Sequence, residues 1–214
     1  MTQTGRIELM APAGSFESLQ AAITNGADSV YFGVDQLNMR ARASINFTID
    51  DLPEIVKRCE EKKVRTYLTL NTIIYDHDLT IIKTLLDAAK AARITAVIVM
   101  DQAVISYARQ IGMEIHISTQ INITNIETVK FYAMFADTMV MSRELSLRQV
   151  KKITDQIDKE NITGPAGNVV EIEIFGHGAL CMAVSGKCYM SLHSHNSSAN
   201  RGACKQNCRK KYTV

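Results

Sequence analysis

The sequence predicts an α/β protein: a TIM-type (β/α) barrel that stops before its closing strand and continues into a Cys-rich C-terminal segment. Short apolar runs alternate with amphipathic runs over residues 1–175, which is typical of a parallel sheet with right-handed crossovers. The short runs are mostly apolar throughout, as expected of strands covered on both faces. Hydrophobic residues make up 46% of the 214 residues, enough for one sizeable core, so intrinsic disorder is excluded.

Turn and capping residues delimit the first elements. A brief strand at 8–11 ends at Pro12-Ala13-Gly14, and Ser15 caps a helix that runs to Asn25. A second strand covers 29–32, and Asp50 or Asp51 caps the next helix. Cys59 falls among the apolar positions of that helix, so we interpret it as a small core residue.

The strand–helix unit then recurs. We expect strands at 65–70, 96–100, 114–118, 138–142 and 171–175. We expect helices between them at 79–92, 102–111, 125–135 and 146–159. The prediction is therefore seven strands separated by six helices, whereas a closed barrel needs eight strands and about 250 residues.

A doubly wound sheet is the alternative to the barrel. Such a sheet usually carries a GxGxxG phosphate turn after its first strand, but the turn here is Pro12-Ala13-Gly14-Ser15. The barrel is therefore favoured, with residues 1–175 as its body and residues 176–214 as a basic, Cys-rich segment packed on its rim.

In such barrels the reactive side chains follow the strand ends. The candidate catalytic residues at these positions are Asn71, Asp101, Gln120, Arg143, Glu144 and His177. Asn71 and Asp101 could equally cap helices, whereas the charged pair Arg143–Glu144 suits an anionic substrate. His116 lies inside a strand and is interpreted as a core or barrel-lining residue.

Charge is distributed unevenly along the chain. The 41 residues after Glu173 contain six Lys and Arg and no Asp or Glu, whereas the first 173 residues carry 18 basic and 22 acidic side chains. A basic tail on a mildly acidic body suggests an anionic partner, most commonly nucleic acid, and a solvated terminus is the alternative. Lys210 and Lys211 are the candidate phosphate-binding residues in this tail.

Cysteines gather in the same tail: Cys181, Cys188, Cys204 and Cys208. Without a secretory signal a disulfide framework is the weaker interpretation, and four thiols so close in sequence more often hold a metal or an iron–sulfur cluster. The spacing is not that of CxxC pairs, and thiolate ligation suits zinc as well as iron. We expect the four sulfurs to converge near His177 at the rim, even without a metal.

The same stretch resembles the collagenase-like peptidase family U32. That family's signature begins at Glu173 and ends at Ser191, and every defined position is filled here: Glu173, Phe175, Gly178, Ala179, Leu180, Cys181, Gly186, Cys188, Met190 and Ser191. The segments ELMAPAG, NGADSVYFG, STQIN and SRELS also look like that family. The resemblance covers nearly the whole chain.

The C-terminal motif is most similar to the family's tRNA hydroxylation proteins, which are implicated in making 5-hydroxyuridine at the wobble position. The resemblance implies a [4Fe–4S] cluster on Cys181, Cys188, Cys204 and either Cys208 or a residue beyond Val214. It also implies tRNA as a partner and prephenate as a cosubstrate, which Arg143, or alternatively Arg40 and Arg42, would hold.

Two other functions stay open at this point. The family name suggests a collagenase-like peptidase, although the sequence contains no HExxH motif and four Cys ligands would leave a metal no open position. A non-catalytic, cluster-binding subunit paired with a paralogous chain is the third possibility. No apolar run approaches the roughly 20 residues of a membrane span, and residues 1–6 are polar, so we expect a cytoplasmic protein with no membrane partner.

Overall fold

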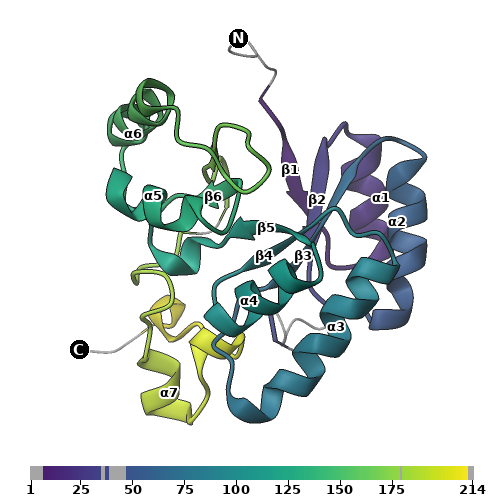
Figure 1. The fold of residues 1–214 in the computed structure, drawn as a ribbon. Helices are drawn as coiled ribbons and strands as arrows, with labels where there is room; N and C mark the ends of the chain where they lie inside the picture. Colours follow the sequence, from purple (N-terminus) through teal and green to yellow (C-terminus); the bar gives the residue numbers. More distant parts are fainter. Residues whose placement is uncertain (1–6, 35–36, 39–46, 179, 212–214) are drawn as a thin grey trace.

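Seven parallel strands form one curved sheet, and helices cover its outer face (Figure 1). The computed structural model describes residues 7–34, 37–38, 47–178 and 180–211. The strands are β1 (Met10–Pro12), β2 (Ser29–Phe32), β3 (Arg65–Leu70), β4 (Ala96–Val99), β5 (Glu114–Ile117), β6 (Thr138–Val140) and β7 (Glu171–Glu173). They pair in sequence order, with β1 and β7 at the two edges. This is an open TIM-like (β/α) barrel, as predicted.

Six helices alternate with the strands, and a seventh lies in the C-terminal segment. They are α1 (Phe16–Thr24), α2 (Leu52–Glu60), α3 (Leu79–Ala91), α4 (Gln102–Gln110), α5 (Ile126–Ala133), α6 (Leu147–Glu160) and α7 (Met190–His195). Short 3₁₀ turns lie at Ile49–Asp51, Asp76–Asp78, Thr119–Ile121, Ala199–Arg201 and Asn207–Arg209. No helix in the described residues is long and apolar enough to cross a membrane.

The core lies between the sheet and its helices. Alternate strand residues, such as Val30, Leu68 and Ile115, point outward and pack against the apolar faces of the helices. Cys59 on α2 is fully buried in this layer, and burial raises the pKa of its thiol to about 11. The prediction that Cys59 is a core residue is confirmed.

The concave face of the sheet is more polar. Its apolar part is a small cluster centred on Tyr67, Ala96 and Ile98. The same face carries His116 on β5 and Glu173 on β7, because these residues occupy the alternate positions that point away from the helices.

Several boundaries differ from the sequence-based expectation, and β6 and β7 each end two residues earlier than expected. β1 lies at 10–12 instead of 8–11, because these are the residues that pair in register with Ser29, Val30 and Tyr31 of β2. Asp51 occupies the N-cap position of α2, as one of the two expected residues, and its carboxylate accepts the Thr48 N–H at the start of the preceding 3₁₀ turn. Helix α7 was not predicted, since six residues carry no clear amphipathic period. Arg40 and Arg42 lie outside the described residues.

Candidate functional site

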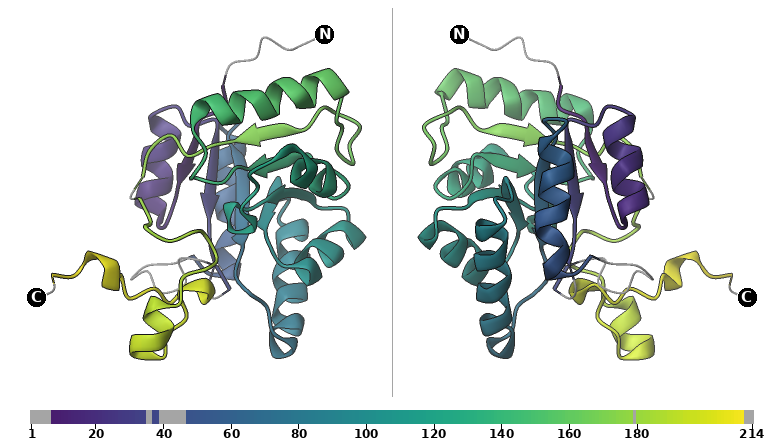
Figure 2. Two further views of the ribbon diagram at one scale, coloured as in Figure 1. Left: turned by 90° about the vertical axis from the view of Figure 1, so that its left-hand side faces the viewer. Right: turned by 90° about the vertical axis from the view of Figure 1, so that its right-hand side faces the viewer.

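Strand ends and the C-terminal segment meet at one end of the barrel. Both views in Figure 2 place α7 and the segment around it at the end of the sheet away from the N-terminus. Because the strands are parallel, their carboxyl ends converge there. At this rim the Asn71 amide, after β3, donates to the Ser118 hydroxyl, after β5, at 3.2 Å.

Asp101 acts as a helix cap. One carboxylate oxygen accepts the Ala103 N–H of α4 at 2.9 Å, and the other accepts the Ile74 N–H at 3.2 Å. Both oxygens are therefore used to hold the loops after β3 and β4 together. Of the two interpretations that the sequence left open, capping is the one that these contacts support.

Arg143 and Glu144 do not form a charged pair that faces outward. The Arg143 guanidinium donates to the Ser185 hydroxyl at 2.6 Å and to the Ala183 carbonyl at 3.2 Å. The exposed Glu144 carboxylate accepts from the Ser142 hydroxyl, which lowers its pKa. The side chain expected to hold an anionic cosubstrate thus fastens residues 183–185, between two cysteines, to the end of β6.

Asn122 and Gly186 complete this attachment. The Asn122 amide donates to the Ser185 carbonyl at 2.5 Å. Gly186 has φ +71°, and a Cβ there would lie 3.0 Å from the Gln120 carbonyl oxygen, so a larger residue would be strained and glycine is favoured at this close approach. Gln120 Oε1 and Asn122 Oδ1 are buried and have no hydrogen-bond partner among the described residues.

Arg201 fastens the second pair of cysteines. Its guanidinium forms a fork with the buried Asp78 carboxylate, at 2.6 and 3.1 Å, and also donates to the Ile73 carbonyl at 2.8 Å. It lies 4.6 Å from the centre of the Tyr75 ring. The Arg201 hydrogen bond holds the pKa of Asp78 below its usual value. This contact anchors the residues before Cys204 on the loop after β3.

The four cysteine-bearing stretches lie side by side, but their thiols are not assembled. The Arg209 guanidinium donates to the Leu180 carbonyl at 3.4 Å, next to Cys208 and Cys181 respectively. The Lys205 N–H, next to Cys204, donates to the Ser191 hydroxyl at 2.9 Å. In the part of the chain that the structure describes, no three Cys, His, Asp or Glu side chains are grouped to hold a metal ion.

The donor chemistry suits a soft metal even though the sulfurs have not converged. Cys181, Cys204 and Cys208 are exposed, and Cys188 is half-buried. Cys204 Sγ accepts the Gln206 N–H at 3.3 Å, the kind of amide–sulfur contact that accompanies cysteine ligands in metal sites. The prediction that the sulfurs converge without a metal is wrong for this structure, because each attachment to the rim runs through a residue other than cysteine. His177 is exposed in the loop after β7.

Glu173 and His116 are polar residues on the concave face of the sheet that sequence reasoning did not place in the site. His116 is 3% exposed, and its Nε2 lies 3.2 Å from the Glu114 carboxylate. In the part of the chain that the structure describes, the buried atoms His116 Nδ1 and Glu173 Oε2 have no hydrogen-bond partner. Burial raises the pKa of Glu173. The sequence offered one signal, because Glu173 is the first residue of the ten-position signature. The residues that share its face of the sheet come from other strands, so the sequence did not place them beside it.

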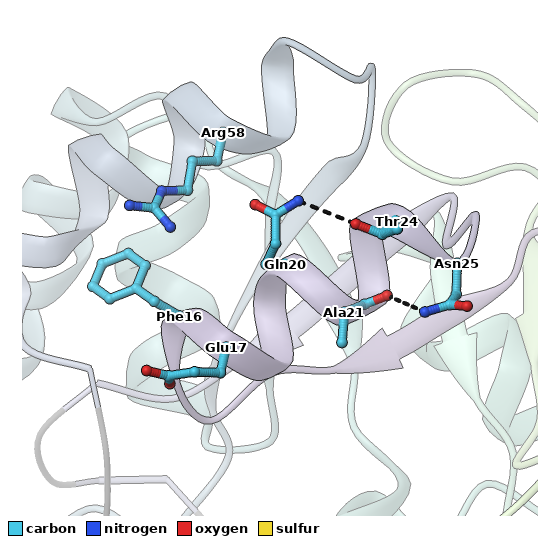
Figure 3. Close-up of a pocket in the computed structure, with 7 residues that line it drawn as sticks. All are labelled: Phe16, Glu17, Gln20, Ala21, Thr24, Asn25 and Arg58. Carbon is cyan, nitrogen blue, oxygen red and sulfur yellow. Dashed lines mark hydrogen bonds between the residues drawn. The ribbon is translucent and has the colours of Figure 1, made fainter.

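A separate groove lies outside this end of the barrel. Figure 3 shows it between α1 and α2, where the Arg58 guanidinium covers the Phe16 ring at 4.6 Å. It is lined by Phe16, Glu17, Gln20, Ala21, Thr24, Asn25 and Arg58. None of the predicted site residues takes part, so the groove does not belong to the rim site.

Together these contacts define an open (β/α) barrel whose strand ends are covered by the thiol-rich, basic segment 176–211, called the cap below. The model of peptidase family U32 matches residues 14–214, so the chain belongs to that family. It is 58% identical over 207 residues to a collagenase of Porphyromonas gingivalis, which covers 97% of this chain and 50% of the relative. It is 33% identical over 214 residues to tRNA hydroxylation protein P1 of Bacillus subtilis, and this match covers 99% of this chain and 48% of that relative.

A solved U32 peptidase structure has the same fold. It superposes with a TM-score of 0.59 at 13% identity, and the match covers 81% of this chain and 70% of that one. The chain spans about half the length of the two curated relatives named above.

Proposed function

We propose that this chain is the barrel part of an RNA-modifying enzyme that hydroxylates uridine at the wobble position of tRNA without using O₂. The observation that carries the proposal is the cap itself. A segment with four cysteines and no acidic residue is fastened over the strand ends by Arg143 and Arg201. Similarity to a protein named for tRNA hydroxylation over 99% of the chain supports it.

In this proposal Cys181, Cys188, Cys204 and Cys208 hold a [4Fe–4S] cluster, with zinc as the alternative occupant. A cluster bound there would supply electron transfer. The chain's own contribution is to carry the four thiols on loops tied to the rim at Ser185 and Arg201. The Arg209–Leu180 and Lys205–Ser191 contacts keep the cysteine-bearing loops adjacent.

Prephenate is the proposed cosubstrate. Arg143 donates through Nε and Nη2 to Ser185 and Ala183, so a carboxylate bound through its other N–H groups would lie beside that loop. Arg40 and Arg42 follow β2 in the sequence and stay the alternative anion-binding residues. A paralogous subunit is a further proposed partner.

The decisive experiment compares tRNA nucleosides from cells with and without the gene by mass spectrometry. Loss of 5-hydroxyuridine that is restored by the wild-type gene supports the proposal. Restoration by a gene that carries Cys181→Ala would contradict a role for the cysteine segment. Cys59→Ala is the matched control and should restore the nucleoside fully.

Peptidase activity is the second candidate, favoured by the 58% identity to a protein named collagenase. A Ser–His–Asn group does occur in the C-terminal segment: Ser194 Oγ lies 2.8 Å from His195 Nδ1, and the Asn207 amide donates to Ser194 Oγ at 2.6 Å. However, Ser194 donates its own proton to the Met190 carbonyl at 2.7 Å, so the imidazole does not activate it as in a serine hydrolase. Cleavage of denatured collagen that Ser194→Ala abolishes would support this candidate instead.

A further inference from the structure

The cap exposes large apolar side chains among exposed cations. Leu180 and Met182 are 69% and 76% exposed, and the Tyr189 ring is 63% exposed. Five cations of the same segment are also exposed: Lys187, Lys205, Arg209, Lys210 and Lys211. None of these five forms an ion pair with a carboxylate among the described residues.

This combination of groups selects one kind of partner. Cations without carboxylate partners suit phosphates, whereas exposed apolar and aromatic surface suits planar bases. A duplex would present phosphates but would keep its bases stacked inside, so it would leave the apolar part of the surface uncovered. Single-stranded RNA satisfies both halves of the surface.

Tyr189 is the side chain best placed to stack on a base. Its backbone is fixed at the start of α7, where its carbonyl accepts the His193 N–H at 2.9 Å. Among the described residues its ring has no aromatic or cation–π partner, whereas Tyr75 lies against Arg201 and Phe131 packs on Tyr132 and Phe135. Tyr189 also directly follows Cys188, so a base stacked on it would lie beside the proposed cluster.

We propose that the cap binds a single-stranded stretch of RNA, with Tyr189 stacking on a base and Lys187 and Lys205 contacting the flanking phosphates. The proposal rests on the function proposed above and deepens it, because it states how the substrate loop is held. It predicts a preference for loops over duplexes, independent of whether the cluster is loaded.

The test uses an anticodon stem-loop with 2-aminopurine in the loop, together with a blunt duplex of equal charge. Stacking should quench the 2-aminopurine fluorescence on binding to the wild-type chain. Tyr189→Ala should weaken loop binding roughly 5- to 100-fold and abolish the quench, while Tyr189→Phe retains both. The salt dependence of RNA binding should be the same for Tyr189→Ala as for the wild type, because the phosphate contacts remain. The double variant Lys187→Glu/Lys205→Glu should show a weaker dependence of affinity on salt concentration.

Phe131→Ala on α5 is the matched control, since it removes a 53% exposed aromatic ring far from the cap in sequence. Thermal melting of each variant verifies folding. Equal loop affinity for the Tyr189→Ala and wild-type chains overturns the proposal. The proposal is also overturned if a cap variant changes the sedimentation coefficient of the protein but not its RNA affinity. That result would identify the surface as a protein–protein interface.

The two proposals can fail separately. If cells lose 5-hydroxyuridine without the gene but Tyr189→Ala binds the loop normally, the stacking proposal fails and the enzyme proposal stands. If 5-hydroxyuridine is unaffected by loss of the gene but Tyr189→Ala still weakens loop binding, the enzyme proposal fails and the stacking proposal stands.

Discussion

Arg201 is the residue on which the second half of the cap depends. Its partner Asp78 is buried, so Asp78→Asn leaves the guanidinium without its counter-charge. We expect the variant to lose about 1–3 kcal/mol of unfolding free energy at pH 7. Because the pKa of Asp78 is lowered by Arg201, this contribution exists above the unfolded pKa of about 3.9 and disappears as the pH falls through the folded value.

Urea unfolding of both chains at pH 7 and in acid measures this difference. Asp155→Asn, which breaks the exposed Lys151–Asp155 pair on α6, is the control and should have little effect. If the loss of unfolding free energy in Asp78→Asn were the same in acid as at pH 7, the ion pair would not be its cause.

Glu173 gives the opposite pH dependence. Burial raises its pKa, so the carboxylate opposes folding once it is charged. Wild-type stability should fall as the pH rises above the unfolded pKa of about 4.3 and through the folded value, then stay lower. Glu173→Gln should remove this loss and be more stable than the wild type at neutral pH. A variant less stable than the wild type at neutral pH would mean that the charged carboxylate has a partner.

At the scale of elements, the loop between Cys181 and Cys188 is held by close contact at Gly186. Gly186→Ala places a methyl group against the Gln120 carbonyl at a positive φ, which should cost about 1 kcal/mol or more and loosen the cap. Limited proteolysis should cut the variant faster within 176–190. Gly14→Ala, whose Cβ meets nothing within 4 Å, should be cut at the wild-type rate.

The cysteine quartet is tested as one unit. After anaerobic purification we expect iron and sulfide with the wild type and with Cys59→Ala. We expect neither with Cys181→Ala, Cys188→Ala or Cys204→Ala, because three thiolates hold a four-iron cluster less securely. Loss with Cys208→Ala would assign the fourth ligand to Cys208, and retention would assign it elsewhere. A colourless wild-type protein that contains zinc would contradict the iron–sulfur assignment.

At the scale of the whole molecule, the open barrel has unequal strands. β3, β4 and β5 each have neighbours on both sides, whereas β1 and β7 are three-residue edge strands. Hydrogen exchange should therefore be slow in β3–β5 and fast in β1 and β7, because edge amides open without breaking a second ladder. Strong protection of both edges would instead indicate that another segment or copy pairs with them.

The sequence determined the alternation of elements, the parallel sheet and the burial of Cys59, because hydrophobic period and capping act within a few residues. It also marked the C-terminal segment as the region that carries the cysteines and positive charge. Its errors were local, as at β1 and α7, where short elements take their limits from pairing and docking.

Tertiary structure alone decided what each polar rim residue does. Arg143 and Glu144 are adjacent in sequence, yet one bonds Ser185 and the other Ser142. Arg201 meets Asp78 across 123 positions, and Glu173 faces His116 from another strand. Such partnerships depend on how strands curve and loops return, and no pattern of a few residues encodes that geometry. Side-chain identity therefore indicated which groups were available, and packing selected their partners.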